Sequence, residues 1–476
     1  MTTRRKSSIL APLAVCGLLS AWIVLWVGSA RTLGFSIAIY ALANLIVYTD
    51  ALDFLLRIYV RRRHTAGSAS EKSSQKNLSI NLSAILPDDA MRLVPAAPFA
   101  IIGSVFNLED QLDEFIKAFA PYRNRMWLIS DGSTDNTVLR LRQAGWRCFD
   151  DGVNRRKPGA LRRLLQHLPA QIETVMVIDP DIRIRAVGDG STIDLDQFVV
   201  DFQQSGAAAV CPRIMIEPDG FLARFQAFEY ALAFRVGRES LADFGVTSGV
   251  SFYRRSALQR ALGEHSLSVY AEDFENAVIL LSHGERIYYD GRLVVSTEGP
   301  GSLQRWFSQR VGWHYGLIKV YTERFGKVLR VARRSPFAAY HYLFYVGGLT
   351  LAIHLVKVVS AGLLCLSLLG GLDAIMLGDL SPLGAYANPE YFTAAISSYL
   401  ALGVLALFTR VPKEERAYIA PIVPLYLCYA MAHIIPMTVG YGNFFALKLF
   451  RRRLYQDHYE STLTINSLPD NARTTE

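Results

Sequence analysis

Residues 9–29 of this chain, ILAPLAVCGLLSAWIVLWVGS, form an apolar run without a single charge. A helix needs about 20 such residues to cross the hydrocarbon core of a bilayer. Arg4, Arg5 and Lys6 precede the run, so a cleaved signal peptide is an alternative interpretation. However, the run is longer than the apolar core of a signal peptide, and a second apolar run follows from Leu33 to Leu56. The sequence therefore predicts a transmembrane hairpin that stays attached to the chain.

Three later apolar blocks, at residues 338–370, 390–409 and 417–449, indicate further membrane spans. With 51% apolar and 19% charged residues, the chain is also more apolar than a typical soluble protein. The last block contains five residues that interrupt helices, namely Pro421, Pro424, Pro436, Gly440 and Gly442. A broken helix or a re-entrant hairpin is therefore expected there, and the chain is predicted to have five or six spans.

Lys and Arg residues flank the N-terminal hairpin on both sides, and such cations tend to remain in the cytoplasm. Residues from about 58 to 336 contain no comparable apolar run. We therefore expect a multi-pass protein of the plasma, or inner, membrane whose large middle section is cytoplasmic. The five cysteines lack metal-binding spacing, which fits a reducing compartment. Because the cations behind the net charge of +8 gather near spans, the sequence indicates a lipid bilayer as partner and no nucleic acid.

In the middle section, short β-branched runs alternate with helical patterns. This alternation predicts an α/β fold, a mostly parallel sheet with helices on both faces. The expected strands lie near residues 99–105, 126–130, 146–150 and 174–179, and the expected helices at 109–120, 134–144 and 158–167. Two later segments, 218–240 and 302–334, mix aromatic residues with Arg and Lys, as helices at a membrane surface do. Core helices of the soluble domain are the alternative interpretation of these two segments.

Four polar clusters of the middle section carry candidate chemistry. The loop LISDGSTDNT follows one expected strand, and NRRKPGAL places cations at a helix start, where a diphosphate can bind. Asp179 and Asp181 end the strand VMVI, and two carboxylates at that spacing suit Mg²⁺ or Mn²⁺. Glu272 and Asp273 precede a helical run, so one of them could accept a proton from a substrate hydroxyl. Capped loops, a solvated basic turn and ordinary helix-start acids are the alternatives.

In this order the clusters resemble the family 2 glycosyltransferases, specifically the membrane-embedded polysaccharide synthases that make hyaluronan, chitin and cellulose. The resemblance implies an inverting transfer of sugar from a nucleotide-sugar donor, with Mg²⁺ or Mn²⁺ as cofactor. It also implies a role for each polar cluster. Asp131 would contact the nucleotide base, Lys157 the diphosphate and Asp179 the nucleotide, while Asp181 would hold the metal and Asp273 would act as general base.

Two further segments resemble the acceptor side of these synthases. VTSGVSFYRRSAL contributes Ser248 and Gly249, and SQRVGW matches the QxxRW signature through Gln309 and Trp313. Glu272, beside the expected base, is assigned to the acceptor as well. Gly312 stands where the signature has Arg, and the missing cation could be replaced by Arg310 or Arg305. The growing polysaccharide is the acceptor that this resemblance implies.

The resemblance also implies an arrangement of six segments along the chain. These are an N-terminal transmembrane hairpin (1–58), a polar linker (59–95), a cytoplasmic GT-A glycosyltransferase domain (96–301), amphipathic interfacial helices (302–336), a C-terminal transmembrane region (337–450) and a polar cytoplasmic tail (451–476). The 23 residues after Arg453 are too few to fold alone, so a regulatory or export subunit would be a partner chain. The competing functions are a transferase that adds one sugar to a lipid phosphate or lipid-linked glycan, and a transporter or receptor with a degenerate nucleotide-binding domain.

Overall fold

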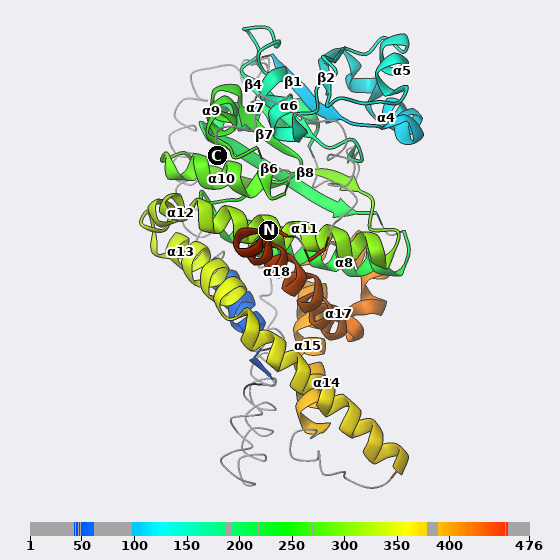
Figure 1. The fold of residues 1–476 in the computed structure, drawn as a ribbon, viewed down its shortest axis with the longest axis vertical. Coiled ribbons are helices and arrows are strands. Elements are labelled where there is room, and N and C mark those ends of the chain that lie inside the picture. Colours follow the sequence, from blue (N-terminus) through cyan, green and yellow to red (C-terminus); the bar gives the residue numbers. More distant parts are fainter. Residues whose placement is uncertain are drawn as a thin grey trace, which may run out of the picture. The chain divides into compact units, whose positions relative to one another are not determined.

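The computed structural model describes most of residues 42–60, and residues 98–185, 193–217, 219–267, 270–377, 389–452 and 454–455. The chain divides into two compact units, each made of two segments. One unit combines Met1–Arg57 with Tyr345–Thr438, and the other combines Ile58–Phe344 with Val439–Glu476. The second unit contains the α/β domain (Figure 1).

One eight-stranded sheet organises the α/β domain, with the order β3-β2-β1-β4-β7-β6-β8-β5. Its strands are β1 (Phe99–Val105), β2 (Met126–Ser130), β3 (Cys148–Phe149), β4 (Thr174–Ile178), β5 (Arg183–Ile184), β6 (Ala209–Ile216), β7 (Ser251–Arg254) and β8 (Ile287–Thr297). The four strands expected from the sequence are therefore β1 to β4, each at its predicted place.

The sheet is mixed, which corrects the prediction of a mostly parallel sheet. The first four strands, in the order β3-β2-β1-β4, pair in parallel as expected. Strand β7 runs antiparallel to both β4 and β6, and β5 runs antiparallel to β8. The regular alternation of strand and helix that predicts parallel pairing ends at β4, so it carries no information about the second half of the sheet.

Helices cover both faces of the sheet, as the sequence predicts. Alternate side chains of a strand point to opposite faces, so Ala100 and Ile102 join one core while Phe99 and Ile101 join another. The first core is completed by helices α6 (Arg156–Leu164), α9 (Arg255–Glu264) and α10 (Glu272–Ser282). The second core is completed by α4 (Leu112–Phe119), α5 (Thr137–Gln143) and α7 (Leu195–Ser205).

Two later helical segments belong to the same unit. The first consists of α8 (Phe221–Leu232) and a π-helical turn η4 (Ala233–Arg238), and the second of α11 (Leu303–Glu323) and α12 (Phe325–Ala332). Val320 and Val328 join the core beside α6, α9 and α10, so one face of α11 and α12 packs into the α/β domain. Figure 1 shows α11 and α12 following one another along α10. Short 3-10 turns, η2 (Glu109–Gln111) and η3 (Ala120–Arg125), flank α4.

The C-terminal apolar blocks are helical. They form α13 (Pro336–Ala339), the π-helical η5 (Tyr340–Ala352), α14 (His354–Leu377), α15 (Pro389–Thr409), α16 (Lys413–Ile419), the 3-10 turn η6 (Ala420–Leu425), α17 (Tyr426–Ala432) and α18 (Ile434–Phe450). Pro421 and Pro424 lie in η6, where the last block changes its helical geometry. The helix type therefore changes where the prolines predict a break, although Lys413–Phe450 remains one helix long enough to cross a membrane.

Within the described residues, Phe392–Thr409 and Lys413–Phe450 are long and apolar enough to cross a membrane. A third candidate is the pair Pro336–Ala352 and His354–Leu369, which is bent by 53°. Val47 packs in a core with residues of α14, α15, α17 and α18, so the described end of the N-terminal hairpin folds together with these apolar helices. The predicted first span, the linker at 65–90 and most of the tail lie outside the described residues.

Candidate active site

The DGSTDNT loop follows β2 and leads into α5. Gly132 has a φ of +75°, and a Cβ there would lie 2.9 Å from the backbone nitrogen of Asn154. Asp131 is buried, and its carboxylate accepts a 2.6 Å hydrogen bond from the backbone N–H of Arg155, next to the start of α6. Burial raises the pKa of Asp131 to about 6, although the N–H groups of Arg155 and Arg156 oppose this shift. Asp131 thus connects the DGSTDNT loop with the NRRKPGAL segment.

Lys157 of the NRRKPGAL segment contacts an acidic residue from each of the two remaining polar clusters. Its ammonium lies 2.5 Å from the Asp179 carboxylate, after β4, and 2.9 Å from the Glu272 carboxylate, at the start of α10. The two carboxylates raise the pKa of Lys157, so it remains a cation despite its burial. Burial raises the pKa of Asp179 to about 6, against the attraction of Lys157. Residues that are far apart in the sequence therefore meet in one charged cluster.

Gly249, which the sequence assigns to the acceptor side, lies against this cluster. A Cβ at Gly249 would lie 2.1 Å from Oδ2 of Asp179 and 4.0 Å from Nζ of Lys157. The neighbouring Ser248 is buried, with its hydroxyl donating to the carbonyl of Val250 at 2.7 Å. Only a glycine leaves room for Asp179 to reach Lys157.

Gly249→Ala is therefore expected to displace Asp179 from Lys157. The displaced Asp179 would lose its predicted hydrogen bond to the nucleotide, and because a hydrogen bond to a charged group contributes about 1.5–3 kcal/mol, nucleotide affinity should fall about 10- to 100-fold. Isothermal titration of the nucleoside diphosphate measures this change. Gly263→Ala in α9 is the matched control, because no heavy atom lies within 4 Å of its added Cβ. Equal affinity of the two variants would contradict a role for Asp179 in nucleotide binding.

Asp181 lies two residues after Asp179 and has a different environment. Its Oδ2 accepts a hydrogen bond of 2.5 Å from the hydroxyl of Thr297 at the end of β8. No group of three or more His, Cys, Asp or Glu side chains that could hold a metal occurs among the described residues. One carboxylate with a neighbouring hydroxyl is nevertheless a hard oxygen donor set. It fits Mg²⁺ or Mn²⁺, which proteins often bind with one or two carboxylates and the phosphates of a substrate.

Asp273, the candidate base, lies in the first turn of α10. Its Oδ1 accepts a 2.8 Å hydrogen bond from the N–H of Phe274, and its carbonyl accepts one of 2.7 Å from the hydroxyl of Thr247. Arg238, at the end of η4, donates to the carbonyls of Val246 and Thr247, the latter at 2.8 Å. Arg238 and Thr247 thus hold the VTSG loop against the start of α10. Neither residue could be predicted from the sequence, because nothing in their local pattern distinguishes them from ordinary polar residues.

A pH dependence follows from the charges around Asp273. Burial and the neighbouring Glu272 raise its pKa to about 6, against the attraction of Arg238. A base must be ionised to accept a proton, so turnover should fall by about tenfold per pH unit well below this pKa. Because the pKa values of Asp131 and Asp179 also lie at about 6, nucleotide affinity should be measured at each pH alongside kcat. A kcat that stays constant down to about pH 4.5 would contradict the assignment of Asp273.

The acceptor-side residues of α11 form their own cluster. The Arg310 side chain is buried, 2.6 Å from the Glu229 carboxylate of α8 and 4.2 Å from the centre of the Trp313 ring. It also donates to the side chain of Gln309 at 2.8 Å. Trp313 keeps 37% of its surface exposed, so an aromatic face remains available to a ligand. Arg310 thus orders Gln309 and Trp313, and its roles in acceptor binding and as a substitute for the missing Arg stay predictions.

A comparison with family models identifies the chain. Residues 194–432, half of the chain, match the model of glycosyl transferase family group 2. The chain belongs to this family. This match confirms the family 2 glycosyltransferase activity that the motifs imply. It also supports the GT-A type α/β fold, whose sheet is mixed. At the sequence level, no curated protein matches the chain.

Solved structures of other glycosyltransferases show distant similarity to this family 2 protein. A mannosyltransferase of Pyrobaculum calidifontis, in complex with GDP-Man and Mn²⁺, is 16% identical; the match covers 83% of this chain and 99% of that chain, with a TM-score of 0.47. Glucosyl-3-phosphoglycerate synthase of Mycobacterium tuberculosis, in complex with Mn²⁺, UDP-glucose and phosphoglyceric acid, is 17% identical. That match covers 48% of this chain and 80% of that chain, with a TM-score of 0.32.

Proposed function

We propose that this family 2 glycosyltransferase is a membrane-embedded, inverting enzyme that extends a polysaccharide from a UDP-sugar and exports the product through its own transmembrane region. The observation that carries the proposal is the meeting of Lys157, Asp179 and Glu272 next to Asp273. This arrangement combines a cation for a diphosphate with a partly buried carboxylate that can accept a proton. A degenerate domain of a transporter or receptor has no need of such a combination.

In the proposed mechanism, Asp131 and Asp179 bind the nucleotide and Lys157 contacts its diphosphate. Asp273 removes the proton from the acceptor hydroxyl, whose oxygen then attacks the anomeric carbon as the bond to the diphosphate breaks. Lys157 offsets the negative charge that builds up on the leaving diphosphate. Asp181 would hold Mg²⁺ or Mn²⁺, which supplies further positive charge to that diphosphate when bound. A single displacement of this kind inverts the configuration of the donor sugar.

The acceptor side would be formed by Ser248, Gly249 and Glu272 together with Gln309 and Trp313. The Trp313 ring suits a sugar because the C–H groups of a sugar ring pack on an apolar aromatic face. Apolar side chains at the starts of α8 and α11 are exposed. Phe221 of α8 is 59% exposed, and Leu303 of α11 is 67% exposed. Such side chains would seat these helices at the bilayer surface, as proposed for interfacial helices.

The membrane arrangement is part of the same proposal. The protein would reside in the plasma, or inner, membrane, with residues 59–336 and the tail in the cytoplasm. Residues 1–58 and 337–450 would cross the bilayer, and the two helices that are long and apolar enough to do so support the second of these assignments. A polymer that is extended in the cytoplasm must cross about 30 Å of hydrocarbon, which explains why such an enzyme is anchored in a membrane.

The second candidate is a non-processive transferase that adds one sugar to a lipid phosphate or lipid-linked glycan. Gly312, which replaces the Arg of the QxxRW signature, favours this alternative. The test is to supply UDP-sugars singly and in pairs to the purified protein, with Mn²⁺ or Mg²⁺, and to determine product size. A long polymer supports the synthase. A single-sugar product that requires added lipid acceptor would support the alternative and reject processive synthesis.

A further inference from the structure

Two glycines of α11 face Tyr270 and Ala271, the segment directly before Glu272 and Asp273. A Cβ at Gly312 would lie 2.3 Å from a ring carbon of Tyr270. A Cβ at Gly316 would lie 2.7 Å from the carbonyl carbon of Tyr270 and 2.8 Å from the Cβ of Ala271. Residues four apart lie on the same face of a helix, so the two glycines make one continuous seat. We call Gly312 and Gly316 the glycine seat.

The segment on the glycine seat has an unfavourable backbone conformation. Ala271, directly before α10, has a φ of +57° and a ψ of 32°. A residue with a Cβ in this left-handed region costs about 1–3 kcal/mol and persists only where its surroundings hold it. Glu272 and Asp273 follow immediately, so the conformation of Ala271 sets the direction in which α10 begins. The contact with Gly316 provides the required restraint.

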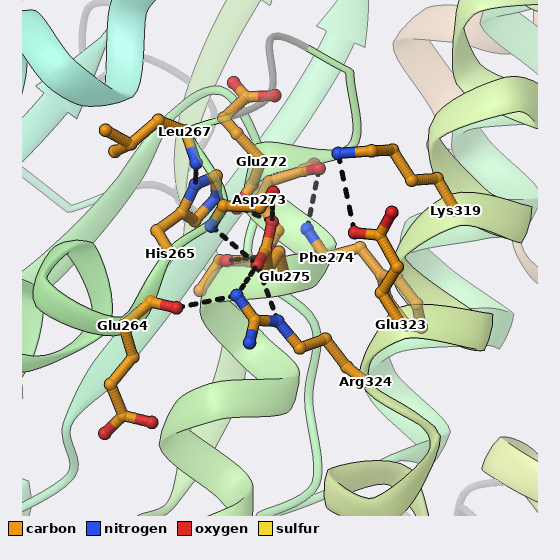
Figure 2. Close-up of polar contacts among 12 residues, drawn as sticks. Glu264, His265, Leu267, Glu272, Asp273, Phe274, Glu275, Lys319, Glu323 and Arg324 are labelled. Atoms are coloured by element: carbon orange, nitrogen blue, oxygen red, sulfur yellow. Dashed lines mark hydrogen bonds and ion pairs between the residues drawn. The ribbon is translucent and has the colours of Figure 1, made fainter. Parts of the chain in front are cut away.

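A buried ion pair connects α10 with the end of α11 (Figure 2). Arg324, which caps α11, donates to the Glu275 carboxylate at 2.8 and 2.7 Å through two nitrogens. Glu275 is 1% exposed and also accepts from the N–H and hydroxyl of Ser266, at 2.9 and 2.6 Å. His265 lies 3.4 Å from the same carboxylate. Arg324 therefore fixes α10 two residues after Asp273, while the glycine seat fixes it two residues before.

We propose that α11 is a positioning element for Asp273, acting through the glycine seat and the Arg324–Glu275 pair. This proposal rests on the proposed function, in which Asp273 is the base and Gln309 and Trp313 of the same helix bind the acceptor. One rigid helix then carries the acceptor platform and holds the base in register with it. Tyr270 occupies the space that a side chain at position 312 would need, so this chain requires glycine at that position.

Gly316→Ala tests the seat most directly, because its added Cβ meets backbone that cannot rotate away. A displacement of a catalytic group by about 1 Å can cost about 10²-fold, so kcat should fall about 10- to 100-fold. Nucleotide affinity should fall much less than kcat, because Asp131, Lys157 and Asp179 lie on other elements and only the Lys157–Glu272 pair connects them with α10. Gly326→Ala in α12 is the matched control, since its added Cβ meets no heavy atom within 4 Å. A kcat for Gly316→Ala equal to that of the control would overturn the proposal.

Gly312→Ala tests whether Tyr270 is the reason for the glycine. Its added Cβ meets a side chain, so Tyr270→Ala should remove the conflict. The double variant should then be no slower than Tyr270→Ala alone, a non-additive result typical of residues in contact. Additive losses would overturn the proposed contact. Gly312→Arg, which restores the family signature, should lower kcat for the same steric reason, and a gain in kcat would also overturn the proposal.

Arg324 provides a test that survives if the glycine variants fail to fold. Arg324→Met should lower kcat much more than nucleotide affinity, and Arg324→Lys should recover part of the loss because it retains one charged donor. An unchanged kcat in Arg324→Met would overturn the role of the pair. If the wild-type protein binds nucleotide but transfers no sugar, the proposed function itself fails. Loss of kcat confined to the variants distinguishes the two cases.

Discussion

Asp273→Asn should abolish most sugar transfer while nucleotide binding remains intact. Asparagine keeps the shape of the side chain but cannot accept the proton of the acceptor hydroxyl. Removing a general base typically lowers turnover by about 10²- to 10⁴-fold, and this range is expected here. The measurement is kcat for release of nucleoside diphosphate, combined with isothermal titration of the same nucleotide.

The matched control for this variant is Asp113→Asn in α4. The Asp113 side chain is 84% exposed and pairs with Arg140 at the surface, so its loss should leave turnover within about twofold of the wild type. If Asp273→Asn also keeps near-normal turnover, Asp273 is not the base, and the adjacent Glu272 becomes the residue to replace next.

Loss of the divalent cation should have the second large effect. Metal ions supply several kcal/mol of charge stabilisation in such reactions, so chelation should lower turnover by at least about 10²-fold. Asp181→Asn should require much higher Mn²⁺ for half-maximal activity. Thr297→Val, which removes the hydroxyl that donates to Asp181, should shift the Mn²⁺ requirement less than Asp181→Asn does. The measurement is activity as a function of Mn²⁺ concentration for the three proteins.

An activity that persists at full rate in excess chelator would contradict metal use. An Mn²⁺ dependence that is identical in Asp181→Asn and the wild type would place the metal elsewhere. Readdition of Mn²⁺ or Mg²⁺ to the chelated wild type is the control for irreversible damage, and it should restore turnover.

The first half of the sheet could be predicted because its physical signals are local. Strands β1, β2 and β4 are short apolar runs, and the helices α4, α5 and α6 separate the first four strands along the chain. The second half could not be predicted in the same way. Strand β7 inserts between β4 and β6, where Thr174 of β4 pairs with Arg254, 80 positions further along the chain, a contact decided by tertiary packing. The antiparallel pairing of the second half could therefore be seen only in the structure.

The site residues could be named from the order of the motifs, but their contacts could not. Lys157 pairs with Glu272 across 115 positions of the chain, and no local pattern encodes such a pairing. Arg310, predicted to substitute for the missing cation, is buried against Glu229, a contact that its position in the sequence does not indicate. Gly312 looked like a missing charge in the sequence. In the structure, the Tyr270 ring occupies the space that a side chain at position 312 would need.

The most direct test of the whole account is release of nucleoside diphosphate from UDP-sugars by the purified full-length protein with Mn²⁺, measured beside Asp273→Asn. We expect release by the wild type from at least one donor, together with a glycan product, and a loss of about 10²-fold or more in the variant. Absence of release from every donor by a wild-type protein that binds UDP, or equal release by both proteins, would contradict it.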